Sequence, residues 1–152
     1  MARQLRYRDI DSLDERQAHE LHALYQREWW SSDRRFDDVE RMLEHSDFIF
    51  GVCRDPGGRL VGFARVLTDR VFKALIFDVI VAEDCRRDGL GRRLIERIVR
   101  HTALADVRHF ELYCLPELVP FYEQLGFSTD VLGLRFMRMV RSGNPGTLEL
   151  RH

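Results

Sequence analysis

The residues of this chain that could do chemistry together gather between Ala74 and Arg93. An apolar run there leads into the loop Arg86-Arg87-Asp88-Gly89-Leu90-Gly91, which opens into an amphipathic helix. The first N–H groups of a helix lack partners within it and carry about half a positive charge, so a phosphate at that position would satisfy both. Gly89 and Gly91 have no side chain, which lets a ligand approach the backbone. The pattern predicts an anion site.

One mixed α/β domain over residues 1–152 would position this loop. The composition, 45% hydrophobic and 32% charged, is that of a soluble globular protein, and 152 residues suffice for one core. Apolar patterns between turn residues predict strands over 4–8, 48–53, 60–68, 74–81, 108–114 and 131–140. Amphipathic spacing predicts helices after 12–15, after 37, over 90–99 and over 117–125, and residues 142–152 are expected to form a loose tail.

Local signals set the boundaries of these elements. Ser12-Leu13-Asp14-Glu15 has the spacing of a capping box, and Asp55-Pro56-Gly57-Gly58 is a turn that joins two strands into an antiparallel hairpin. The 74–81 strand is almost continuously apolar, as in a strand covered on both faces, and Asp78 is its one interruption. The helix residues expected to face the core are Leu21, Leu24, Val39, Met42, Leu43, Leu90, Leu94, Ile95, Ile98 and Val99.

Charge and composition argue against several classes of protein. The formal net charge is −1, whereas a general nucleic-acid binder normally carries a strong basic excess. No apolar run approaches the roughly 20 residues that span a bilayer. The N-terminus, MARQLRYRDID, has charges where a secretory signal has an apolar block, so we expect a cytoplasmic protein without membrane or nucleic-acid partners. Neither the cysteines nor the histidines have metal-ligand spacing, so no metal is expected.

A second motif, Phe121-Tyr122-Glu123-Gln124-Leu125-Gly126-Phe127, follows the loop with room for one helix and one strand between them. The two motifs resemble the GNAT superfamily of acyl-CoA-dependent N-acetyltransferases, in particular its small stand-alone bacterial members, from Asp47 to Met139. The loop is similar to the family's Gln/Arg-x-x-Gly-x-Gly/Ala signature, and the second motif to its aromatic-Tyr-x-x-x-Gly-Phe segment. The resemblance implies an α/β (α+β) fold with a mixed, mostly antiparallel central sheet, a splayed pair of parallel strands and about four flanking helices.

The resemblance also implies acetyl-CoA as the co-substrate. Main-chain N–H groups of the loop would hold its pyrophosphate, and edge groups of Val79 and Val81 would pair with its pantetheine arm like an added strand. An N–H near Ile80 would polarise the thioester carbonyl and stabilise the oxyanion of a tetrahedral intermediate. Asp88 departs from the family pattern, because a carboxylate beside a pyrophosphate is unfavourable unless it turns outward or caps the helix. The loop residues expected to bind the coenzyme are Arg86, Arg87, Asp88, Gly89, Leu90, Gly91 and Arg92.

Three side chains are expected to act in catalysis. The family's tyrosine that matches Tyr122 points at the thioester sulfur, so Tyr122 would protonate the departing thiolate; it could instead be a core aromatic residue. The resemblance implies that the strands 74–81 and 108–114 splay apart around the acyl group, and Asp78 and Glu111 lie in these two strands. Burial there would raise the pKa of either carboxyl and make it a general base for the amine. Asp78 could equally be a hydrogen-bonded structural carboxylate, and Glu111 a solvated strand residue.

The acceptor is expected between the first two helices, where Trp29 and Trp30 could line its pocket or pack at the helix ends. An N-acetyltransferase acting on a small primary amine is the favoured function, and similar small proteins are commonly homodimers. The alternatives are a protein or peptide N-acetyltransferase and a noncatalytic acyl-CoA sensor, against which Tyr122 argues. A dinucleotide-binding fold is disfavoured because Gly89-x-Gly91 lacks the third glycine and the acidic residue about 20 positions on.

Overall fold

A five-stranded sheet forms the centre of the structure, a computed structural model that describes residues 6–141. The contacts within the chain form two units, which divide between Cys114 and Leu115. The expected tail over 142–152, and residues 4 and 5 of the first expected strand, lie outside the described residues. A single domain over residues 1–152 stays a prediction.

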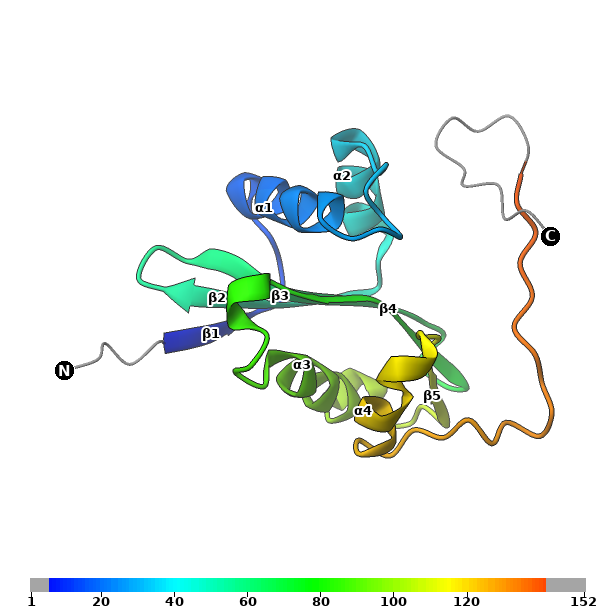
Figure 1. The fold of residues 1–152 in the computed structure, drawn as a ribbon. Helices are drawn as coiled ribbons and strands as arrows, with labels where there is room; N and C mark the ends of the chain where they lie inside the picture. Colours follow the sequence, from blue (N-terminus) through cyan, green and yellow to red (C-terminus); the bar gives the residue numbers. More distant parts are fainter. Residues whose placement is uncertain (1–5, 142–152) are drawn as a thin grey trace. The chain divides into compact units, whose positions relative to one another are not determined.

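The sheet lies in the first unit and has the order β1-β2-β3-β4-β5 (Figure 1). Neighbouring strands from β1 to β4 are antiparallel, and β4 and β5 are parallel, which confirms the expected mixed sheet. The strands are β1 (Arg6–Ile10), β2 (Phe48–Asp55), β3 (Arg59–Thr68), β4 (Lys73–Val81) and β5 (His109–Glu111).

Helices cover both faces of this sheet. Figure 1 shows α1 (Glu15–Gln26) and α2 (Phe36–His45) on one face and α3 (Leu90–Val99) on the other, whereas α4 (Val119–Glu123) belongs to the second unit. On α3, four of the five residues expected in the core are buried, but Val99, the last residue of the helix, is 41% exposed, so its assignment to the core is wrong. The buried cluster beneath α1 and α2 comprises Leu21, Tyr25, Val39, Cys53, Leu60, Phe63 and Ile80.

Three expected elements end differently in the structure. The strand predicted over 108–114 is only three residues long, because β5 pairs with β4 over residues 73–75 and the chain then departs. The helix predicted over 117–125 is a 3-10 turn followed by α4, and its prolines lack the N–H groups that a continuous helix needs. Residues 131–140 form no strand, since the described sheet ends at β5 and a strand requires a neighbour for its main-chain groups.

α1 begins with a capping box that lies two residues later than predicted. The Gln17 N–H donates to Asp14 Oδ1 at 2.8 Å, and the Asp14 N–H donates to Gln17 Oε1 at 3.0 Å. Ser12 and Glu15 were expected in these two positions, but the amide of Gln17 replaces the glutamate. Gln17 is also buried, and its Nε2 donates to the Gly58 carbonyl at 3.4 Å, which links the helix start to the β2–β3 turn.

Replacing Asp14 with alanine is expected to lower the free energy of unfolding by about 1 kcal/mol, because the first turn of α1 loses its cap. Ser12→Ala is the matched control and is expected to change nothing, since the Ser12 hydroxyl bonds to none of the residues that the structure describes. Urea denaturation of both variants measures the difference. A larger loss of unfolding free energy in Ser12→Ala than in Asp14→Ala would show that Ser12 caps the helix.

Candidate active site

The loop after β4 ends in an open helix N-terminus. The Ala82 N–H donates to the Val61 carbonyl at 2.7 Å as the last link to β3, and the 3-10 turn Glu83–Cys85 follows. Gly89 precedes α3, and no side chain in the described part of the chain caps the first turn of that helix. The N–H groups at the start of α3 therefore keep their capacity to bind an anion.

Gly89 is required by its backbone conformation. Its φ of +73° lies in the left-handed region, which costs a residue with a Cβ roughly 1–2 kcal/mol. A Cβ added at Gly89 would meet no atom within 4 Å, so crowding inside the chain is not the reason for glycine. The left-handed turn sends the chain from the loop into α3 and so creates the open N-terminus.

The charged side chains around this helix start point in different directions. The Tyr7 hydroxyl of β1 donates to the Asp88 carboxylate, which is therefore held toward β1. Arg92 pairs with Glu96 one turn further on, at 2.9 Å. Arg87 makes no ion pair with any residue that the structure describes. The Asp88 carboxylate, which departs from the family pattern, is thus bonded to Tyr7 of β1, and phosphate binding by Arg87 stays a prediction.

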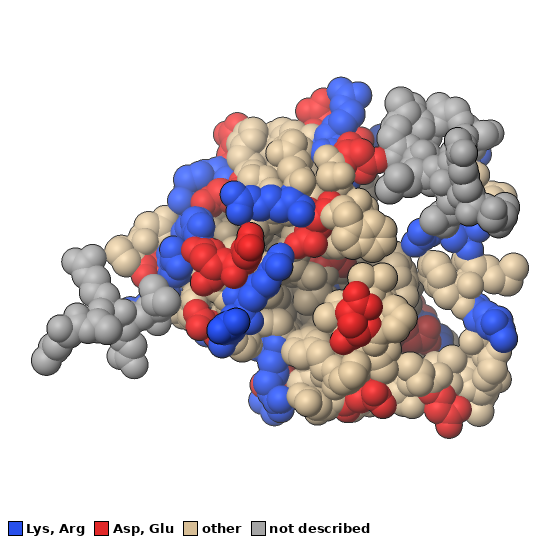
Figure 2. Space-filling model, viewed as in Figure 1, with Lys and Arg blue, Asp and Glu red and all other residues tan. Residues whose placement is uncertain are grey.

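Two other arginines of α3 fasten the helix to the first strands. Arg93 Nε lies 2.8 Å from Asp9 Oδ1, and Arg97 donates to the carbonyls of Gly51 and Ile10 at 2.8 and 3.0 Å. These bonds fix the direction of the helix that carries the anion site. Figure 2 shows acidic and basic side chains mixed over β1 and the loop before α3, without a large area of one sign on this face.

β4 and β5 pair over three residues only, 73–75 with 109–111, and then separate as expected of the splayed pair. Glu111 stands at the last of these pairs. Its carboxylate forms an ion pair with Lys73, and its side chain is 46% exposed. The expectation that Glu111 is a buried carboxyl is therefore wrong, because the strand ends there and the side chain reaches solvent.

The unpaired edge of β4 exposes alternate main-chain groups. The bond between Ala82 and Val61 fixes the alternation, so Ile80, which is opposite Phe63, also directs its N–H and carbonyl toward β3. Val79 and Val81 consequently direct theirs away from β3, as the expected pantetheine edge requires. The Arg86 Nε already donates to the Val81 carbonyl on that side, at 3.3 Å. The Ile80 N–H points toward β3, so the N–H expected to bind the oxyanion is that of Val79 or Val81, and this role stays a prediction.

A bulge in β4 places Asp78 at the centre of a polar network. The register with β3 shifts between Phe63 and Arg65, and Asp78 adopts φ +58° at this point. Its carboxylate accepts hydrogen bonds from the Tyr25 hydroxyl at 3.0 Å, Arg34 Nη1 at 2.8 Å and Arg65 Nε at 2.8 Å. We call these four residues the Asp78 cluster. The bulge adjoins the main-chain edge at Val79, so the cluster holds the backbone from which that edge extends.

The pKa of Asp78 is lowered in this network. Burial is the largest single influence and raises the pKa, but the hydrogen bonds and positive charges of Arg34 and Arg65 together outweigh it. The side chain is only 7% exposed. The expectation that burial raises the pKa of this carboxyl is therefore wrong, because the two guanidinium groups stabilise the ionised form. Asp78 remains a carboxylate at neutral pH and fits the structural alternative.

The second motif forms the end of α4. Tyr122 is 8% exposed, and its ring packs edge-on against Phe121 and Phe127, with centroids 4.9 and 5.9 Å apart. Its carbonyl accepts the N–H groups of Leu125 and Phe127, and Gly126 has φ +97°, so the Leu-Gly-Phe segment closes the helix. This packing explains the aromatic and glycine positions of the motif. The role of Tyr122 as general acid stays a prediction.

The two tryptophans between α1 and α2 differ in their surroundings. Trp29 is 65% exposed and can contact a ligand. Trp30 is partly buried against the core, packs edge-on against Tyr25 and lies under the Arg34 guanidinium, 5.4 Å from it. Trp30 therefore fits helix-end packing. A substrate contact of Trp29 stays a prediction.

The sequence reasoning missed Tyr25, Arg34 and Arg65. No sequence signal marks the third, because the hairpin register pairs Arg65 with Phe77 and only the bulge brings the Asp78 carboxylate to Arg65. Arg34 and Tyr25 also lack a signal, since they reach the cluster from the α1 side through tertiary packing.

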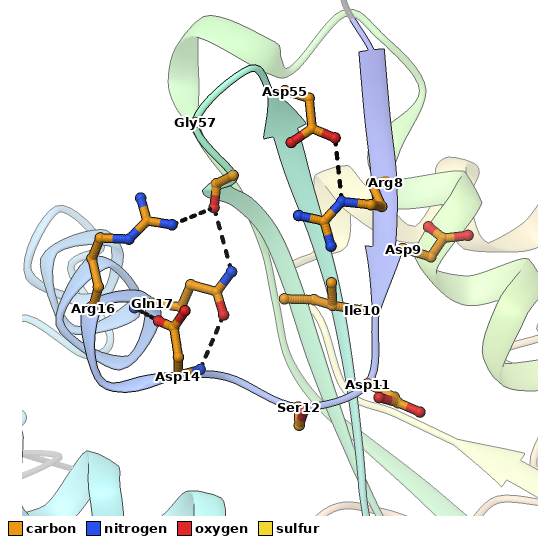
Figure 3. Close-up of a pocket in the computed structure, with 11 residues that line it drawn as sticks. Arg8, Asp9, Ile10, Asp11, Ser12, Asp14, Arg16, Gln17, Asp55 and Gly57 are labelled. Atoms are coloured by element: carbon orange, nitrogen blue, oxygen red, sulfur yellow. Dashed lines mark hydrogen bonds and ion pairs between the residues drawn. The ribbon is translucent and has the colours of Figure 1, made fainter.

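A pocket of about 580 Å³ lies between the end of β1, the start of α1 and the β2–β3 turn (Figure 3). Its polar groups largely pair with one another. Arg8 Nε lies 3.2 Å from Asp55 Oδ2, and the Gly58 carbonyl accepts from both Arg16 and Gln17. The pocket shares no residue with the loop before α3 or with the Asp78 cluster, so we assign it no part in the candidate site.

The described residues contain neither a cluster of metal ligands nor a helix that could span a membrane. No group of three or more histidine, cysteine, aspartate or glutamate side chains in residues 6–141 is arranged to hold a metal ion. No helix within the same residues combines the length and the apolar composition needed to cross a bilayer.

Comparisons with known proteins agree on one family. The model of the Acetyltransferase (GNAT) family matches residues 9–127. Serotonin N-acetyltransferase 2, chloroplastic, from Oryza sativa subsp. japonica is 38% identical over 111 residues, which cover 72% of this chain and 56% of that protein. Histone acetyltransferase TAP1 from Glycine max is 38% identical over 79 residues, 52% of this chain and 34% of that protein. The chain spans about half the length, or less, of these curated relatives.

A solved GNAT-family structure from Xanthomonas campestris pv. campestris has the same fold. It superposes with a TM-score of 0.73 at 26% identity, over 92% of this chain and 98% of that one. The family model covers well over half of the chain, including the loop before α3 and the second motif. The chain therefore belongs to the GNAT family of acetyltransferases.

Proposed function

We propose that this chain is an N-acetyltransferase that moves the acetyl group of acetyl-CoA directly to a primary amine of a small molecule. The observation that carries the proposal is the continuity of two main-chain sites. The unpaired edge at Val79 and Val81 leads within a few residues to the open N-terminus of α3. The strand edge fits an extended arm that contains amides, and the helix N-terminus fits a diphosphate. Acetyl-CoA contains both groups in one molecule.

Each part of the site has a separate task. The N–H groups from Arg87 to Arg92 hold the diphosphate, with the Arg87 guanidinium as an additional charge. The main-chain edge of Val79 and Val81 aligns the arm, and an N–H of this edge stabilises negative charge on the carbonyl oxygen. Tyr122 donates the proton to the leaving thiolate.

The acceptor amine must reach the site without its extra proton. For an alkylamine of pKa about 10.4, deprotonation costs roughly 4.6 kcal/mol at pH 7. The pKa of Asp78 is lowered by two guanidinium groups, so its carboxylate is a weak base. Glu111 is exposed and pairs with Lys73, so it is not the buried carboxyl expected beside the acceptor. We assign Asp78 a positioning role and leave removal of the proton to water near the acceptor.

The relatives do not decide the acceptor, since their names refer to serotonin in one case and to histone in another. The decisive experiment measures thiol release from acetyl-CoA with a panel of amines and peptides, while calorimetry follows acetyl-CoA binding separately. Thiol release with small amines supports the proposal. Release with peptides alone would favour a protein acetyltransferase, and binding without release would favour a sensor. A cytoplasmic location, a bacterial origin and a homodimer stay predictions.

Replacing Gly89 with valine is expected to weaken acetyl-CoA binding about tenfold, because a β-branched residue cannot hold φ +73° without roughly 1–2 kcal/mol of strain. The helix start would then shift away from the diphosphate. Gly89→Asn is the matched control and should retain most of the affinity, since asparagine tolerates the left-handed region. Isothermal titration calorimetry measures both variants. Unchanged acetyl-CoA affinity in the valine variant would show that the backbone conformation of Gly89 does not contribute to coenzyme binding.

A further inference from the structure

The Asp78 cluster carries more positive than negative charge. Arg34 and Arg65 both form ion pairs with Asp78, at 2.8 Å each, and neither pairs with a second carboxylate among residues 6–141. Two guanidinium groups therefore share one carboxylate, which leaves a net charge of +1. The side chains of Arg34 and Arg65 are only 29% and 16% exposed, so solvent screens this excess charge less than it would on an open surface.

Part of the donor capacity of Arg65 is unused. Its Nε bonds to Asp78, whereas Nη1 and Nη2 bond to none of the residues that the structure describes. These nitrogens are not sealed in the core, because the one fully buried side-chain nitrogen or oxygen without a partner in the described residues is Arg59 Nε. Arg65 therefore keeps two donor nitrogens, in a planar fork, that are unused and not fully buried, and this geometry matches a carboxylate or a phosphate.

The cluster lies where β4 and the chain after β5 separate. The Arg65 guanidinium stacks 4.9 Å over the ring of Phe77, the residue before the bulge. Phe77 in turn meets Tyr113 edge-on, with ring centroids 6.2 Å apart, and Tyr113 is 55% exposed just beyond the end of β5. Phe77 and Tyr113 thus form an aromatic surface that extends from Arg65 across the point where β4 and the chain after β5 separate.

The cluster also lies on the face that remains open to an acceptor. Figure 1 shows the loop after β4 turning toward the face of the sheet that α3 covers, so a coenzyme held by that loop extends from the α3 face. An acceptor must then reach the β4 edge from the other face. Tyr25 belongs to the core on that α1 face, and both the Asp78 carboxylate and the Arg34 guanidinium contact Tyr25 there.

We infer that the acceptor carries an anionic oxygen group, a carboxylate or a phosphate, in addition to its amine, and that Arg65 together with Arg34 binds this group. The inference rests on the proposed function and specifies its substrate class. The anion balances the excess charge of the cluster and fills the two donors that Arg65 leaves unused. Bound there, it holds the amine of the same molecule beside the bulge of β4.

Matched pairs of acceptors test the inference. The pairs are tryptophan against tryptamine, for a carboxylate, and O-phosphoethanolamine against ethanolamine, for a phosphate. For each pair, kcat/KM of acetyl transfer is measured and corrected for the fraction of free amine. The readout is the ratio of anionic to neutral acceptor, because damage to the bulge affects both members of a pair and cancels. We expect at least one pair to favour its anionic member about tenfold or more.

Variants locate the recognition at Arg65. Arg65→Gln is expected to bring the ratio close to one, and Arg65→Lys to keep part of the preference because the charge remains. Arg59→Gln is the control: Arg59 also shares a carboxylate with another arginine, at Asp84, but lies apart from the bulge, so the ratio should not change.

A wild-type ratio near or below one in both pairs overturns the inference and leaves the proposed function intact, since acetyl transfer still occurs. A preference that survives in Arg65→Gln overturns the assignment to Arg65. If no amine in any pair is acetylated although acetyl-CoA binds, the proposed function itself is wrong and the inference falls with it. The three failures are distinguishable by thiol release and by the ratio.

Discussion

Asp78→Asn is expected to lower the free energy of unfolding by about 3 kcal/mol, because removal of one member of a buried ion pair leaves the other charges uncompensated. Arg34 and Arg65 would retain their positive charges around a neutral amide, next to a side chain that is only 7% exposed. Urea denaturation at neutral pH measures the loss. Acetyl transfer should decline as well, since the bulge loses the contacts that hold it.

Asp84 provides a matched control for this prediction. It also accepts two arginines, Arg54 at 3.3 Å and Arg59 at 2.8 Å, but its side chain is 51% exposed. Water solvates these charges when the pair is broken, so Asp84→Asn is expected to change the free energy of unfolding by less than about 1 kcal/mol. Equal losses in the two variants would show that burial of the Asp78 cluster does not set its energy.

The pH dependence of the same difference has a defined sign. Burial raises the pKa of Asp78 and the two guanidinium groups lower it by more, so the folded-state pKa lies below the unfolded one. The stabilisation is then complete above the unfolded-state pKa of about 3.9 and is lost as the pH falls through the folded-state value. The stability difference between the wild type and Asp78→Asn should therefore stay constant from pH 5 to 8 and shrink below about pH 4.

Tyr122→Phe is expected to lower kcat about 100-fold, the range in which positioned general acids contribute. The substitution removes only a hydroxyl, and the ring contacts with Phe121 and Phe127 remain. Acetyl-CoA affinity, measured by calorimetry, should stay the same because the proposed site binds the diphosphate and the arm through main-chain groups elsewhere.

Thermal unfolding of the phenylalanine variant checks that α4 is intact. A fall in kcat with normal affinity and a normal melting temperature assigns the hydroxyl to proton transfer. An unchanged kcat would make Tyr122 the core aromatic that its 8% exposure also permits.

The parts of the site that are made of main chain could be predicted from the sequence. A continuous apolar strand and the two glycines of the 86–91 loop specify backbone shape, and backbone shape follows from local residues. Gly89 shows this best: its left-handed φ and the open start of α3 are both local properties. The capping box moved by two residues because Ser12 and Asp14 are both good cap residues, and only packing chooses between them.

The charged parts could not be predicted in the same way. The pKa of Asp78 depends on Arg34, which is 44 residues away in the chain, and on a bulge that no residue of the strand announces. Burial alone predicts a raised pKa for Asp78, but Arg34 and Arg65 lower it by more. For 131–140, an apolar pattern favours a strand, yet strand pairing requires a neighbour that local sequence does not describe.

In the proposed site, the coenzyme and the acceptor contact different kinds of atoms. Main-chain amides at the β4 edge and at the start of α3 bind the coenzyme, and most side-chain substitutions leave these amides in place. The acceptor meets arginine and aromatic side chains of the α1 face, each of which one codon change can replace. Acceptor specificity can therefore change during evolution while the acyl donor stays the same. For the same reason, substitutions at the acceptor positions can change selectivity without changing coenzyme affinity.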